Sequence, residues 1–125
     1  MNKQFILIGA CIGAFTVGLG AFGAHALKAI LSATALTTYE TGVRYQFYHC
    51  IALILVGIIY QAFPSKWLCW SGRLFIVGIV LFSGSLYLLS LLEPGYKWMG
   101  AITPFGGVSF ILGWLFLVIG VASKK

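Results

Sequence analysis

The sequence predicts an all-α integral membrane protein, a four-helix bundle with a short interfacial segment between helices 1 and 2. Of its 125 residues, 61% are hydrophobic and 8% are charged, and the mean hydropathy is +1.03. A soluble domain carries roughly 25% charged residues, so this chain has too few to cover a water-facing surface. Its apolar residues form four runs of about 20 residues, enough for a helix to cross a bilayer. We therefore expect a single transmembrane domain, residues 1–125, with spans at 4–24, 42–63, 74–92 and 103–122.

The first predicted span carries no charged residue between Phe5 and Ala24. Small residues recur there every three or four positions and so share one helix face: Gly9, Gly13, Thr16, Gly20 and Gly23. Because small residues let helix backbones approach closely in lipid, this face predicts tight packing. The segment resembles a cleavable signal peptide, but its apolar run exceeds the roughly 7–15 residues of a signal peptide. We expect a retained membrane helix.

Residues 27–38 mix apolar and polar side chains and are predicted to lie at the membrane interface. Thr37 or Thr38 is the expected N-cap of the second helix. Pro64 is expected to end that helix. The residue types therefore predict that the second span begins only after a polar connection.

Charged and polar side chains gather at the first turns of the second span. Glu40 and Arg44 are spaced i,i+4 and can form an ion pair, which lowers the cost of placing either near hydrocarbon. One helix face carries Thr38, Gly42, Tyr45, His49, Ala52 and Val56. We therefore expect Tyr45 and His49 to point into the bundle.

Residues 64–72 are predicted to form a loop whose basic and tryptophan side chains lie at the interface. In the third span, one predicted face carries Arg73, Ile76, Val80, Ser83, Tyr87 and Ser90. Serine and tyrosine side chains on one face predict hydrogen bonds between helices, although a pore lining would show the same pattern.

The fourth span follows an expected turn at Glu93-Pro94-Gly95. Thr103 is the expected cap, and Pro104 is well tolerated in the first turn. Gly106-Gly107 either continues the helix or leaves an unwound stretch. A second small-residue face is predicted from Gly106, Ser109, Gly113 and Gly120.

The formal charge of +6 comes from basic residues at the segment ends. One side of the predicted bundle has Lys3, Lys66, Arg73, Lys124 and Lys125, and the other has Lys28, Arg44 and Lys97. The positive-inside rule then predicts cytoplasmic N- and C-termini. No basic patch with interleaved aromatic residues is present, so nucleic acid is not an expected partner, whereas membrane lipids are.

Five stretches of the chain resemble the small membrane proteins of domain-of-unknown-function family 423. They are Gly20-Ala-Phe-Gly-Ala-His25, Tyr45-Gln46 with His49, Leu81-Phe-Ser-Gly-Ser-Leu-Tyr87, Ile102-Thr-Pro-Phe-Gly-Gly107 and Phe110-Ile-Leu-Gly-Trp114. The chain departs from the family pattern at Tyr39, where tryptophan is expected, and at Gly42, where alanine is expected. The resemblance implies a four-helix protein of the bacterial inner (plasma) membrane, and it supplies no catalytic residues.

The candidate functional cluster gathers the polar residues around the first two spans and two deeper positions on the third: His25, Glu40, Arg44, Tyr45, Gln46, His49, Ser83 and Tyr87. A zinc site would need His25, His49 and Glu40 together, and a haem would need both histidines. Cys11, Cys50 and Cys69 show no ligand or disulfide spacing and are expected to be free thiols. Neither a metal nor another cofactor is predicted.

Nucleophilic catalysis by Cys50 or Ser83 beside His49 lacks a recognisable oxyanion arrangement, so an enzyme is not predicted. The expected function is that of a structural, lipid- or partner-interacting membrane protein with its polar cluster at the external face. The alternative is a transporter or channel for a small solute, ion or proton. Four helices are few for an alternating-access machine, so that alternative calls for a homo-oligomer.

Overall fold

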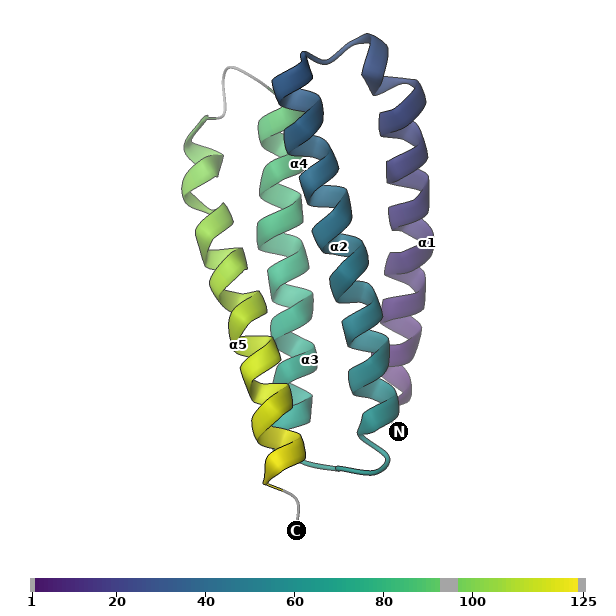
Figure 1. Ribbon diagram of the computed structural model, residues 1–125, viewed down its shortest axis with the longest axis vertical. Coiled ribbons are helices and arrows are strands. Elements are labelled where there is room, and N and C mark those ends of the chain that lie inside the picture. The colour runs from purple at the N-terminus through teal and green to yellow at the C-terminus, as the bar shows by residue number, and fades with distance from the viewer. Residues whose placement is uncertain (1, 93–96, 124–125) are drawn as a thin grey trace.

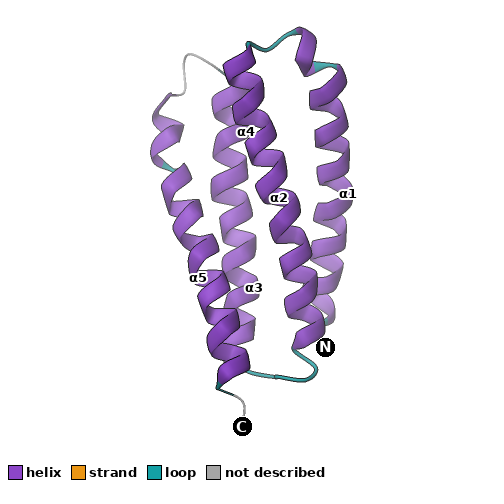
Figure 2. Ribbon diagram, in the orientation of Figure 1, coloured by secondary structure: helices purple, strands orange, loops and turns teal. Residues whose placement is uncertain are grey.

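The computed structural model describes residues 2–92 and 97–123, and these residues form helices joined by short connections. The long helices are α1 (Lys3–His25), α2 (Ala33–Ile59), α3 (Lys66–Gly78), α4 (Gly84–Leu91) and α5 (Thr103–Ala122). Shorter elements are η1 (Leu27–Ala29), the π-helical turn η2 (Ile79–Ser83) and η3 (Lys97–Ala101). The described residues contain no strand (Figure 2), so the all-α prediction is confirmed.

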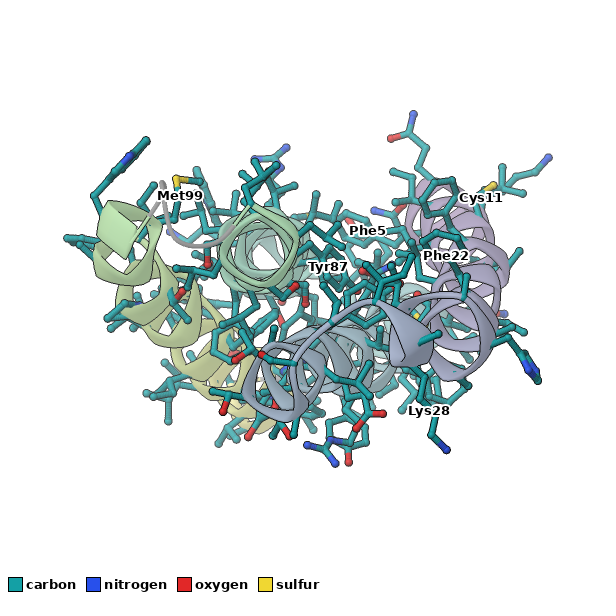
Figure 3. The ribbon with its side chains drawn as sticks, turned by 90° about the horizontal axis from the view of Figure 1, so that it is seen from above. Phe5, Cys11, Phe22, Lys28, Tyr87 and Met99 are labelled. Atoms are coloured by element: carbon teal, nitrogen blue, oxygen red, sulfur yellow. The ribbon has the colours of Figure 1, made fainter. Side chains whose placement is uncertain are left out.

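The helices run side by side in the order α1, α2, α3–α4 and α5, with α3, η2 and α4 forming one continuous rod (Figure 1). The helix α1 packs chiefly against α2, while α5 packs against α3 and η2. Seen from above, α1 and α5 lie at opposite ends of the molecule (Figure 3). Among the described residues, four stretches are long and apolar enough to cross a membrane: Lys3–Ala29, Ala33–Ile59, Lys66–Leu91 and Trp98–Ala122.

The hydrophobic core joins α2 to the α3–η2 rod and α5. It consists of Phe5, Ala52, Leu53, Val56, Leu68, Phe75, Ile79 and Phe110. The helix α1 contributes Phe5, whose ring lies against Gly72 of α3. Outside this core, large apolar side chains face outward, as expected where hydrocarbon replaces water as the solvent.

The two predicted small-residue faces are both packing faces. On α1, a Cβ added at Gly9 would lie 2.9 Å from the carbonyl oxygen of Cys50 on α2. On α5, a Cβ added at Gly113 would lie 2.7 Å from the ring of Phe75 on α3. Larger side chains at either glycine would push the helices apart, so the backbones approach as closely as the glycines permit.

The second helix begins nine residues before the predicted span, and the Thr37 and Thr38 caps are wrong. Ser32 caps it instead, its hydroxyl accepting a hydrogen bond of 3.1 Å from the Ala35 amide. Thr37 and Thr38 lie inside the helix and donate their hydroxyls to carbonyls one turn earlier. Threonine can be satisfied in this way within a helix, so its presence does not mark a helix start.

The third helix also begins early, at Lys66, because Ser65 caps it by accepting a hydrogen bond of 3.3 Å from the Leu68 amide. Most of the predicted loop at 64–72 is therefore helical. The single helix face predicted along this span is wrong as well, since Arg73 and Val80 point outward whereas Ser83 and Ser90 are buried. A π turn adds a residue to its turn of helix, so η2 rotates the buried face part-way along the rod.

The fourth helix matches the predicted range at Thr103–Ala122 and carries Pro104 in its first turn. It stays helical through Gly106-Gly107, so the unwound alternative is not observed. Thr103 does not cap the helix, because its hydroxyl is hydrogen-bonded to the Ser85 hydroxyl of α4. The predicted turn at Glu93-Pro94-Gly95 lies outside the described residues.

Candidate functional site

The structure divides the eight candidate residues between the outside and the inside of the bundle. His25, Glu40 and Arg44 are exposed, Tyr45 is 39% exposed, and the other members, Gln46, His49, Ser83 and Tyr87, are buried or half-buried. The buried members do not converge on one point. Gln46 and Tyr87 bond to each other, whereas His49 and Ser83 make separate contacts between α2 and its neighbours.

The charged pair on α2 lies on the outer surface. Glu40 and Arg44 are both exposed, and no ion pair joins them in the part of the chain that the structure describes. Arg44 instead donates from Nη2 to the Thr41 hydroxyl across 3.3 Å. The expected pairing of these two side chains is therefore not observed.

The side chain of Gln46 links three helices through the interior. Its Nε2 donates to Thr16 Oγ1 on α1 (2.7 Å), and its Oε1 accepts from the Tyr87 hydroxyl on α4 (2.6 Å). The Thr16 hydroxyl in turn donates a hydrogen bond to the Ile12 carbonyl (2.6 Å). Because hydroxyls can donate and accept at once, all three groups are satisfied within this chain of bonds.

Tyr39 of α2 adds a further contact to α1 beside this network, and the sequence did not single it out as a candidate. Its hydroxyl donates to the Leu19 carbonyl across 2.6 Å, and its ring lies against Gly23. The ring centroid is 5.3 Å from that of Tyr87. The spacing of Tyr39 from Gly42 and Gln46 is the signal that would have placed it on the same buried face of α2.

His49 sits between α2, α3 and α5 in an aromatic setting. Its Nδ1 bonds to the Tyr45 carbonyl at 2.7 Å, while its Nε2 accepts from the indole N–H of Trp114 at 3.1 Å. The imidazole stacks on the Phe110 ring with centroids 3.6 Å apart and planes at 8°. An indole N–H can only donate, so Nε2 carries no proton and Nδ1 carries one. The ring is neutral, and both of its nitrogens are occupied.

The two histidines, which a zinc or haem site would need together, do not lie close to each other. His25 is exposed at the C-terminal end of α1, which adjoins the start of α2. His49 lies 16 residues beyond Ala33 within α2, about 24 Å along the helix. In residues 2–92 and 97–123, no three His, Cys, Asp or Glu side chains gather closely enough to hold a metal.

Buried serines fasten the remaining helices to one another. Ser83 donates to the Gly42 carbonyl of α2 (2.7 Å), and Ser109 of α5 donates to the Leu74 carbonyl of α3 (2.7 Å). Ser71 bonds in the same way to Gly113 (2.6 Å). Within the described chain, every buried side-chain nitrogen or oxygen has a hydrogen-bond partner. These serines therefore join helices by hydrogen bonds, as the sequence predicted for Ser83 in the third span.

Comparison with known proteins adds to this geometry. The family described as "Protein of unknown function (DUF423)" matches residues 19–107, a range that contains all eight candidate residues. The chain belongs to this family. The UPF0382 membrane protein of Staphylococcus saprophyticus is 50% identical over 118 residues, covering 94% of this chain and 96% of the relative. No solved structure matches the chain.

Further relatives place the DUF423 chain among membrane proteins. The UPF0382 membrane protein YwdK of Bacillus subtilis is 42% identical, with 94% of each chain covered. The UPF0382 inner membrane protein YgdD of Escherichia coli K12 is 40% identical, covering 100% of this chain and 95% of the relative. Together with the four apolar helices, these relatives show that the chain is a polytopic membrane protein.

Proposed function

We propose that this protein works by non-covalent contact with its membrane surroundings, binding lipid or a neighbouring membrane protein, and that it catalyses no reaction. The observation that carries the proposal is the position of α1. Only 17% of the most apolar stretch of Lys3–Ala29 is buried, against 44% for Ala33–Ile59. A helix that packs chiefly against one neighbour offers most of its surface to other molecules.

The closed interior favours contact over transport. A path for ions or solutes needs polar groups that can bind the passing species. Here the amide of Gln46 and both ring nitrogens of His49 are already hydrogen-bonded within the protein. A transport pathway would have to lie between protomers of a homo-oligomer, and none of these contacts favours that second candidate.

We also propose an orientation in the bacterial inner membrane, with both termini in the cytoplasm. The start of α1 and the end of α5 lie at the same end of the bundle (Figure 1). Lys3, Lys66 and Arg73 belong to helix segments near that end, whereas Lys28 and Arg44 belong to the opposite end. The positive-inside rule supports a cytoplasmic position for the first group. A reporter fused after Lys125 that is active only in the cytoplasm tests this orientation.

Site-specific photo-crosslinking in living cells tests the main proposal. A photoreactive residue replaces Phe15, which is 70% exposed on α1, or Val118, which is 62% exposed on α5. The proposal predicts a discrete lipid or protein adduct from position 15 and only diffuse background from position 118. Equal, diffuse labelling at both positions would contradict it. Unaltered circular dichroism of each variant controls for folding.

A further inference from the structure

A groove runs along the surface where α1 meets α2. Its volume is about 430 Å³, and its walls include Val17, Gly20 and Ala21 of α1 and Val43 and Phe47 of α2, with Arg44 beside them. The groove exists because α1 has small residues here: a Cβ added at Gly20 would lie 3.5 Å from Val43. An apolar furrow on a membrane-facing surface suits a hydrocarbon chain.

A cation and an anion follow one another on α2, and the cation, Arg44, lines this groove. The Arg44 side chain extends toward the helix N-terminus, where it donates to Thr41, in keeping with the tilt of side chains on a helix. Glu40 lies one turn further toward that end, about 6 Å along the axis and on the same face. Both side chains are exposed, and no ion pair between the two is found in the described residues, so both are available to a ligand.

We propose that the α1–α2 groove binds a phospholipid whose phosphate is followed by an ammonium group. An acyl chain would occupy the groove, the phosphate would meet Arg44, and the ammonium would meet Glu40. The order of the groups on α2, from apolar wall to cation to anion, is the order of groups along such a lipid. A lipid with a phosphate and no ammonium would leave Glu40 facing negative charge, which is unfavourable.

Lys28 lies at the same end of the bundle as Glu40 and Arg44. Its side chain points outward from the connection between α1 and α2 (Figure 3). Its charge attracts the phosphate of any phospholipid, whatever follows it. Lys28 and Arg44 together therefore provide general affinity, and Glu40 provides the discrimination between headgroups. The inference rests on the proposed function, because it names the lipid that the outward side of α1 and α2 would bind.

Native mass spectrometry of the delipidated full chain in mild detergent tests the headgroup. Phosphatidylethanolamine and phosphatidylglycerol with identical acyl chains are added separately at equal concentrations. The proposal predicts about two- to fivefold tighter binding of phosphatidylethanolamine, the size of effect expected for an exposed charge pair. In Glu40→Gln this preference disappears, because affinity for phosphatidylethanolamine falls while affinity for phosphatidylglycerol is kept or rises. In Arg44→Gln both affinities fall.

Matched controls separate the site from general lipid coating. Arg73→Gln removes an exposed arginine that lies over Trp70 on α3, away from the groove, and should leave the preference intact. Ala21→Phe fills the groove and should weaken both lipids, whereas Ala10→Phe, elsewhere on the exposed surface of α1, should not. Each variant is first checked for wild-type helicity by circular dichroism.

Equal binding of the two lipids to the wild type, or a preference that survives in Glu40→Gln, would overturn the headgroup assignment. If a discrete adduct still forms from position 15 in the photo-crosslinking experiment, only the lipid assignment has failed. If the headgroup preference and the discrete adduct from position 15 are both absent, the proposed function is overturned as well.

Discussion

Trp114 donates its indole N–H to Nε2 of His49 across 3.1 Å and thereby joins α5 to α2 through the interior of the bundle. This bond fixes the tautomer of the histidine, since its Nδ1 must then supply the proton shared with the Tyr45 carbonyl. Phe110 covers one face of the ring. His49 is thus a neutral, structural hydrogen-bonding residue that needs no metal or proton partner to be satisfied.

Replacing Trp114 by phenylalanine should destabilise the fold. Trp114→Phe keeps an aromatic ring but leaves His49 Nε2 without a donor, and hydrogen bonds of this kind within membranes are worth about 0.6 kcal/mol on average and up to about 1.7 kcal/mol. Denaturation by SDS followed by circular dichroism measures the change. Trp70→Phe is the control, because Trp70 is about as exposed as Trp114 (50% against 43%) and its ring contacts Arg73 of its own helix. Equal losses in the two variants would argue against a special role for the Trp114–His49 bond.

Gln46→Leu should cost more stability than Tyr87→Phe. The leucine removes the hydrogen bonds that Gln46 makes to buried Thr16 and to half-buried Tyr87, whereas the phenylalanine at position 87 removes only the second of these bonds. The expected losses are about 1–3 kcal/mol for each buried group left unsatisfied. In the double variant the losses should be less than additive, since the two side chains share a bond. Additive losses in a double-mutant cycle would show that the bond contributes nothing.

Valine at Gly9 should separate α1 from α2, whereas valine at Gly18 should be tolerated. A Cβ at Gly9 would meet the Cys50 carbonyl oxygen at 2.9 Å, but nothing lies within 4 Å of one at Gly18. Overpacking of this kind costs about 1–3 kcal/mol, so the melting temperature of Gly9→Val should fall. Similar melting temperatures for the two variants would contradict the assigned packing face.

The register of α1 on α2 can be tested by a disulfide with a native thiol. A Cβ at Gly13 lies 3.6 Å from Cys50 Sγ, within reach of a disulfide after a small adjustment. In a background of Cys11→Ala and Cys69→Ser, Gly13→Cys should therefore lose free thiol under oxidant within the monomer. Gly18→Cys should keep both thiols apart. Thiol counting by mass spectrometry reads the outcome, and bonding in the second variant would refute the register.

Much of the helix packing could be predicted from the sequence, for a physical reason. In lipid, helices gain little from burying apolar side chains, so close approach depends on small residues, which are visible as a periodic pattern. That pattern located the packing faces of α1, around Gly9, and of α5, around Gly113. The spacing of small residues could not predict η2, because no residue type or spacing in Ile79–Ser83 indicates a π turn.

The candidate site was predicted less well than the fold. The zinc and haem alternatives required His25 and His49 to meet, but α2 starts at Ala33 and carries His49 deep into the bundle. The partner of His49 is Trp114, 65 residues away, and such pairings depend on tertiary contacts. Gln46 and Tyr87 were named as candidates, yet their bond to each other emerged only once α2 and α4 were placed together.

The central claim is that this protein acts through its outward surface on α1 and α2. The most direct test is the mass of the full chain released from its own membranes into mild detergent and measured by native mass spectrometry. The account predicts a defined mass above that of the protomer, contributed by lipid or by a partner protein. Bulky substitution at Ala21 should remove this mass, whereas the same change at Ala10 should not. A bare protomer mass for the wild type, or an added mass indifferent to Ala21, would contradict the account.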